Sequence, residues 1–71
     1  MTIGEKIHDL RVRNGMTMED LAREINLMGM EITPLIISRI EKGQRHVCDG
    51  ELLMISRALH VTMEWLCGMD E

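Results

Sequence analysis

The feature that most constrains this chain is a segment that carries a helix start signal and a helix stop signal. Thr33 can accept a hydrogen bond at a helix N-cap, and Pro34 fits the first helical position, where a backbone N–H is not needed. Gly43 can take the left-handed conformation that ends a helix. Together these residues predict one short helix, over residues 34–42.

The predicted helix has two unlike faces, because successive side chains turn by about 100° around the axis. The apolar side, which we expect to face the core, consists of Ile36, Ile37 and Ile40. The opposite side is mostly polar and basic and consists of Leu35, Ser38, Arg39 and Lys42. Hydrogen-bond donors and positive charge continue into the following loop as Gln44, Arg45 and His46. A short helix with this division suits a DNA groove.

Similar signals predict four more helices, over residues of about 3–13, 18–28, 50–59 and 63–67. Thr17 and Thr62 are expected to cap the second and fifth helices, and Asp49 is expected to cap the fourth. The apolar connection 26–32, with Gly29 in it, is longer than the usual turn of a helix-turn-helix. With no linker or repeat, the sequence predicts one all-α domain over residues 1–71.

Several side chains are expected to lie outside the core of this domain. Lys6, Arg11 and Arg13 are expected to be exposed cations of the first helix, which either form a solvated face or include at least one phosphate contact. Met54 and Arg57 lie off the apolar stripe of the fourth helix, so neither is expected to face inward.

Composition excludes several classes of protein and site. Eight Met, one Trp and no Phe or Tyr predict an aliphatic and thioether core. Neither a signal peptide nor a membrane-spanning run is evident, so we expect a cytoplasmic protein with no membrane partner. Cys48 and Cys67 are interpreted as reduced thiols that serve as small packing residues. No metal-site spacing, cofactor motif or catalytic acid–base pair is present. We therefore expect that the protein binds no metal and no cofactor and is not an enzyme.

Charge is unevenly distributed along the chain. The formal net charge is −4, which by itself is unusual for a nucleic-acid binder. Residues 32–48, however, carry Arg39, Lys42 and Arg45 against the single acid Glu41. This pattern predicts a basic face on an acidic body, with a weak long-range attraction to phosphate.

The chain resembles the lambda-repressor-like helix-turn-helix regulators of the Cro and xenobiotic-response-element type. The resemblance covers almost the whole chain and rests on IGEKIHDLRVRNGMTMEDLA, IISRIEKGQR and ELLMISRALHVTMEWLCG. It implies a compact five-helix fold with a helix-turn-helix formed by the second and third helices. It also implies a homodimeric, sequence-specific DNA-binding transcription factor, with a repressor the favoured role.

The resemblance assigns roles residue by residue. The positions that read bases in the family fall on Pro34, Leu35, Ser38 and Arg39. The positions that contact the DNA backbone fall on Thr17, Met18, Lys42, Gln44 and Arg45, and we add the neighbouring His46. Three departures from the family pattern are Met18 in place of a common glutamine, the Pro34–Leu35 pair in place of polar readers, and the long turn at residues 28–32.

The chemistry of the side chains on the polar face favours different DNA contacts for different residues. Arg39 can contact guanine O6 and N7 with two of its guanidinium nitrogens, Ser38 can pair with several base edges or with phosphate, and Leu35 can pack on a thymine methyl. An ion pair of Arg39 with Glu41 or Glu24 is the alternative interpretation. No small-molecule effector is evident, so we expect regulation through abundance, a protein partner or modification.

A second functional hypothesis is a helix-turn-helix fold used mainly for protein binding, as in an antitoxin-like or co-regulator module. The acidic total, the apolar Pro34–Leu35 pair and the Met-rich turn favour it. The last helix is apolar as well, and we expect it to form the dimer interface through Met63, Trp65, Leu66 and Met69. The alternative is that Trp65 and Leu66 close the core of one subunit.

Overall fold

The computed structural model describes residues 1–68, which form five α-helices and no strand. The helices are α1 (Ile3–Arg13), α2 (Met18–Leu27), α3 (Pro34–Glu41), α4 (Asp49–Ala58) and α5 (Met63–Cys67). None of the helices in these residues is long and apolar enough to cross a bilayer. The all-α, five-helix fold class expected from the sequence is thereby confirmed.

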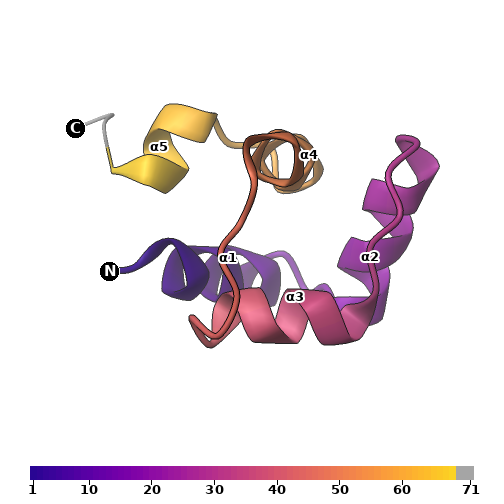
Figure 1. Ribbon diagram of the computed structural model, residues 1–71, viewed down its shortest axis with the longest axis horizontal. Helices are drawn as coiled ribbons and strands as arrows, with labels where there is room; N and C mark the ends of the chain where they lie inside the picture. Colours follow the sequence, from indigo (N-terminus) through magenta and orange to yellow (C-terminus); the bar gives the residue numbers. More distant parts are fainter. Residues whose placement is uncertain (69–71) are drawn as a thin grey trace.

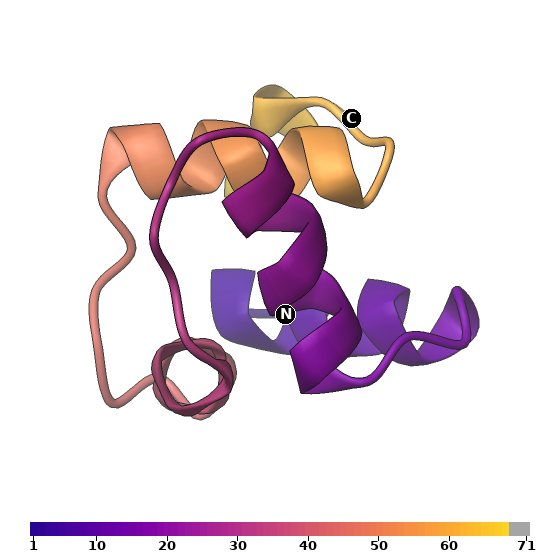
Figure 2. The ribbon, with the colours of Figure 1, turned by 90° about the vertical axis from the view of Figure 1, so that its right-hand side faces the viewer.

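The five helices make two layers joined by an upright helix (Figure 1). In Figure 1, α1 and α3 run along the lower side, α4 and α5 lie above them, and α2 stands at the right. After a quarter turn, α2 is seen to cross between α3 below and α4 above (Figure 2). The body measures 30 × 23 × 21 Å, and α3 occupies its lower edge.

One aliphatic core holds the layers together. Every helix contributes to it, and the turn before α3 contributes Ile32. Its members share nearly complete burial: Ile7, Leu21, Ala22, Ile25, Ile32, Ile37, Ile40, Leu52, Ile55, Leu59 and Leu66. Methionines 16, 18, 30, 54 and 63 pack around this centre and fill its margins with flexible thioether chains.

The helix ends follow a common design, in which a residue with positive φ closes the last turn. At the end of α2, Gly29 donates to the Asn26 carbonyl at 3.0 Å and Met30 donates to the Ile25 carbonyl at 3.4 Å. Gly29 has φ of 99°, a conformation that costs glycine little. His60 takes the corresponding position after α4 with φ of 60°, although it is not a glycine.

Helix boundaries differ from expectation at four places. α2 ends at Leu27, α3 at Glu41 and α4 at Ala58, each one residue early, because the next residue already caps the helix. α4 begins at Asp49, so its N-cap is Cys48 and not Asp49. The Cys48 backbone N–H donates to the Glu51 carboxylate at 3.0 Å, which is how a capping box satisfies the start of a helix.

The burial of several side chains differs from expectation. Cys48 and Cys67, interpreted as packing residues, are both exposed. Arg11 is buried and Lys6 is half-buried, although both were expected to be exposed cations. Met54 is half-buried against the core rather than turned away from it. Ile36 packs only on the margin of the core, because α3 presents Ile37 and Ile40 more directly to α1 and α2.

Gly4 brings the first turn of α1 unusually close to the end of α3. A Cβ atom at this position would lie 2.4 Å from the Ile40 carbonyl oxygen and 2.7 Å from the Glu41 carbonyl oxygen. Both contacts are with backbone, which cannot rotate away as a side chain can. The distance between α1 and α3 therefore requires glycine here.

We predict that Gly4→Ala lowers the free energy of unfolding by about 1–3 kcal/mol, because α1 and α3 must move apart to admit the methyl group. Urea unfolding followed by circular dichroism measures the change. Gly50→Ala is the matched control, since Gly50 lies in α4 and a Cβ there would meet only the Met30 methyl at 3.5 Å. It should be neutral or stabilising by up to about 1 kcal/mol. Equal losses in both variants would contradict the close-contact interpretation.

Candidate nucleic-acid interface

α3 separates its two faces as its sequence predicts. Ile37 and Ile40 point into the core with 1% and 3% of their surface exposed. On the other side Leu35 is 59% exposed, Ser38 is half-buried, and Pro34, Arg39 and Lys42 are exposed. Thr33 begins the helix by accepting the Ile36 N–H at 3.2 Å. The structure thus leaves the proposed reading residues accessible on one rigid element.

The end of α3 is fixed by a buried ion pair with α1. Arg11 Nε donates to Glu41 Oε2 at 2.6 Å, and Arg11 Nη2 donates to Glu41 Oε1 at 3.0 Å. Arg11 Nη1 also donates to the Met16 carbonyl at 2.8 Å, and His8 Nδ1 lies 2.9 Å from Glu41 Oε1. One guanidinium therefore joins α1, the loop before α2 and the last residue of α3.

The electrostatics of this pair favour the charged forms of both partners. Burial acts to raise the pKa of Glu41, but hydrogen bonds from Arg11 and His8 outweigh it and leave that pKa lowered. The hydrogen bonds to Glu41 raise the pKa of the Arg11 guanidinium. Since Glu41 is occupied by Arg11, the alternative ion pair between Arg39 and Glu41 is not formed.

The loop after α3 is held by a second ion pair. Arg45 Nη1 and Nη2 each donate to a Glu51 carboxylate oxygen at 2.9 Å, and these bonds lower the pKa of Glu51. The Arg45 side chain is only 34% exposed, so a phosphate would have to share the guanidinium with Glu51 or displace it. Gln44 and His46 on either side are exposed.

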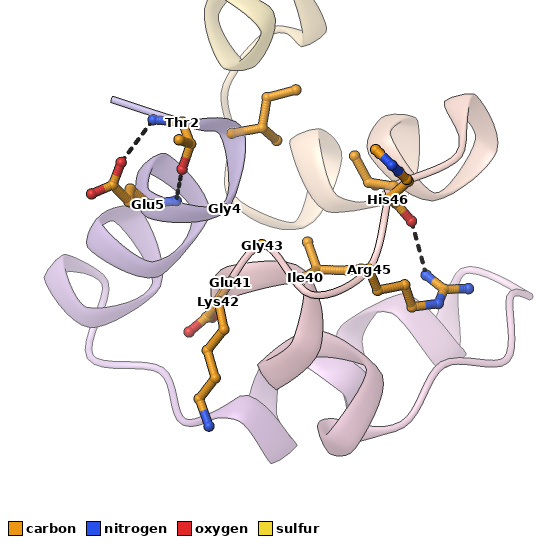
Figure 3. Close-up of a pocket in the computed structure, with 11 residues that line it drawn as sticks. Thr2, Gly4, Glu5, Ile40, Glu41, Lys42, Gly43, Arg45 and His46 are labelled. Carbon is orange, nitrogen blue, oxygen red and sulfur yellow. Dashed lines mark hydrogen bonds between the residues drawn. The ribbon is translucent and has the colours of Figure 1, made fainter.

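A pocket of about 440 Å³ lies between the first turn of α1 and this loop (Figure 3). Its lining includes Thr2, Gly4, Glu5, Gly43 and His46. Figure 3 shows the Lys42 side chain extending away from Gly4 and Gly43, so its ammonium group lies outside the pocket.

The start of α2 lies close to α3. Thr17 caps α2 by accepting the Asp20 N–H at 3.0 Å, and Asp20 accepts the Thr17 N–H in return at 2.9 Å. Met18 is half-buried on the core, and with Ser38 and Lys42 it lines a groove of about 360 Å³ facing α1. The acids of α1 along this groove, Glu5 and Asp9, oppose a close approach of phosphate at that side.

The four residues expected to form a dimer interface differ in how accessible they are. Leu66 is fully buried and Met63 packs on the core, so Leu66 belongs to the interior of the subunit and cannot meet a second copy. Trp65 is 37% exposed, and Lys6 Nζ lies 5.2 Å from its ring centroid while donating to its carbonyl at 3.0 Å. Met69 lies outside the described residues.

Two comparisons with known proteins bear on this arrangement. A family model described as helix-turn-helix matches residues 7–66. The fold is similar to that of the P22 c2 repressor protein, solved in complex with a synthetic operator, with a TM-score of 0.85 and 21% identity over 99% of this chain and 98% of that one. No curated protein sequence matches the chain.

We predict that Glu41→Gln lowers the free energy of unfolding by about 3–5 kcal/mol, because Arg11 would remain buried without a counter-charge. Urea unfolding at neutral pH measures the loss. Arg13→Ala is the control, since Arg13 pairs with Asp9 at the surface and its loss should cost less than about 1 kcal/mol.

The same pair gives a pH dependence. The folded-state pKa of Glu41 lies below the ordinary value of 4.5, so its contribution is present above that pH and is lost as pH falls through the folded pKa. The acid limb of the stability–pH curve should therefore be shallower in Glu41→Gln than in the wild type. Parallel acid limbs would contradict this assignment.

Proposed function

We propose that this chain, which belongs to the lambda-repressor-like family of helix-turn-helix proteins, binds double-stranded DNA sequence-specifically and represses transcription as a homodimer. The observation that carries the proposal is the outward face of α3, which presents exposed Leu35 and Arg39 on a helix fixed at both ends. The similarity of fold to a repressor solved with its operator supports the same class of ligand.

In the proposed complex, α3 lies in the major groove. Arg39 reads guanine through two of its guanidinium nitrogens, Ser38 pairs with a base edge or a phosphate, and Leu35 with Pro34 packs on a thymine methyl. These contacts specify the sequence. An exposed leucine on an otherwise polar helix face is well suited to this apolar part of the readout.

The backbone contacts surround this face. Lys42, Gln44 and His46 are exposed beyond the end of α3, and Thr17 with Met18 begins the neighbouring α2. We assign to them the phosphate contacts that fix register without reading sequence. Arg45 joins them only by exchanging or sharing its bond to Glu51, so its net contribution should be smaller than that of Lys42.

The homodimer is proposed at the end of the molecule that carries α5. In Figure 1, α5 lies at the upper left while α3 runs along the lower edge. A two-fold axis beside α5 would place the two α3 helices of the dimer on the same side of the assembly. Binding to two DNA half-sites about one helical turn apart requires this arrangement. Trp65 is the exposed anchor of this interface, with Met63 beside it.

Protein binding remains the second candidate function, and exposed apolar side chains favour it. Leu27 is 77% exposed at the end of α2, and Leu35 and Met28 are exposed as well. Binding to DNA falls steeply with salt because counterions are released, whereas apolar docking does not. A salt titration of the bound species therefore separates the two functions.

We predict that Arg39→Ala weakens binding to the preferred site by about 1–3 kcal/mol and relaxes the preference at one base position. Selection from random DNA duplexes, followed by binding measurements at several salt concentrations, tests this. Lys42→Ala is the matched cation control and should weaken all sequences alike and reduce the salt slope by about 1. An unchanged selected sequence with Arg39→Ala would remove Arg39 from the readout.

We predict that the wild-type chain sediments as a dimer at tens of micromolar and that Trp65→Ala shifts it toward monomer, because the exposed ring is lost from the interface core. Leu35→Ala removes an exposed apolar side chain from α3 and should leave the sedimentation unchanged. The melting temperature of the wild type should rise with protein concentration. A wild type that remains monomeric would exclude this interface.

A further inference from the structure

The turn between α2 and α3, residues 28–33, is organised by one side chain of α2. Asn26 Nδ2 donates to the Met30 carbonyl at 3.2 Å and to the Ile32 carbonyl at 3.0 Å. A primary amide has two N–H groups on one nitrogen, so both donors are used within the turn. The backbone bond from Met30 to the Ile25 carbonyl closes the first half of the turn, and Asn26 closes the second.

This arrangement fixes where α3 begins. The Ile32 side chain is buried in the core, and its carbonyl is held by Asn26. Thr33, the next residue, is the N-cap of α3. The carbonyl that Asn26 holds therefore belongs to the peptide bond that joins Ile32 to the N-cap residue. A turn longer than three or four residues has more backbone conformations available to it. The hydrogen bonds of Asn26 restrict the turn to one of them.

The two ends of α3 are held by separate devices. The C-terminal end is fixed by Arg11, which pairs with Glu41, and by the contact of Gly4 with the last carbonyls. Neither device touches the turn before the helix. A change at Asn26 should therefore move the N-terminal end of α3, where Leu35 lies, more than the last turn, where Arg39 lies.

We infer that Asn26 is a positioning residue for DNA readout, which sets the N-terminal end of α3 in the groove without contacting a base. This inference rests on the proposed function. It assigns the long turn a role as a rigid spacer and makes Asn26, rather than the apolar side chains of the turn, the residue on which that role depends.

The test compares selected DNA sequences among variants. Leu35→Gln and Arg39→Ala first identify the base positions that depend on each end of α3. Asn26→Ala should then relax the positions altered by Leu35→Gln, with roughly tenfold weaker binding to the preferred site, and should keep those that depend on Arg39. Its salt slope should match that of the wild type, since no phosphate contact is lost.

Leu27→Ala is the matched control, because Leu27 is the next residue of α2, is exposed and is uncharged. It should leave the selected sequence unchanged. Asn26→Asp keeps the side-chain shape without its N–H donors and should relax the same positions as Asn26→Ala. Thermal unfolding of each variant ensures that binding is measured on folded protein.

Three outcomes overturn the inference. An unchanged selected sequence with Asn26→Ala would show that the turn holds its place without the amide, and equal relaxation at both ends of α3 would indicate a general loss of stability. A Leu27→Ala variant that behaves like Asn26→Ala would assign the role to apolar packing. A wild type that selects no sequence would instead contradict the proposed function itself, which the wild-type control reveals before any variant is compared.

Discussion

The buried contact between Arg11 and Glu41 is the interaction on which the geometry of this molecule depends. Two charges that leave water incur a large desolvation cost, and only close pairing with further hydrogen bonds offsets it. Here the guanidinium uses two nitrogens on the carboxylate and a third on the Met16 carbonyl, so a shift of α1 relative to α3 would break hydrogen bonds of both groups. A hydrophobic contact tolerates small sliding movements, whereas this one does not. The pair therefore specifies the position of α3 more than it adds stability.

The rest of the interface follows from that constraint. Gly4 allows α1 to approach the last carbonyls of α3, Arg45 and Glu51 tie the next loop to α4, and Asn26 closes the turn that precedes α3. The Arg45–Glu51 and Asn26 contacts both lie near the end of a helix, where backbone groups lack partners inside the helix. The aliphatic core beneath is adaptable because it is rich in methionine at its margins. In this molecule apolar packing holds the helices together, and polar contacts near helix ends fix their relative positions.

Much of the fold could be predicted from the sequence because its signals are local. Thr33, Pro34 and Gly43 bracket α3 within one segment, and the isoleucine spacing indicates which face is buried. Contacts between distant segments were not predictable in the same way. Arg11 looked like an exposed cation because its partner lies 30 positions further along the chain. The engagement of Arg45 by Glu51 was missed for a similar reason, since a loop cation beside a DNA-like helix has an equally reasonable partner in phosphate. His60, which ends α4 in a conformation usually given to glycine, carried no signal at all.

The placement of Trp65 has an optical consequence. The chain contains no tyrosine and no phenylalanine, so the absorption near 280 nm and the intrinsic fluorescence come from this one indole. Its ring is partly exposed and lies beside the Lys6 ammonium, at the junction between α1 and α5. The emission therefore reports on that junction alone, with no contribution from the region around α3. The protein therefore carries a native probe of the α1–α5 junction, and events at that junction can be followed without attaching a label.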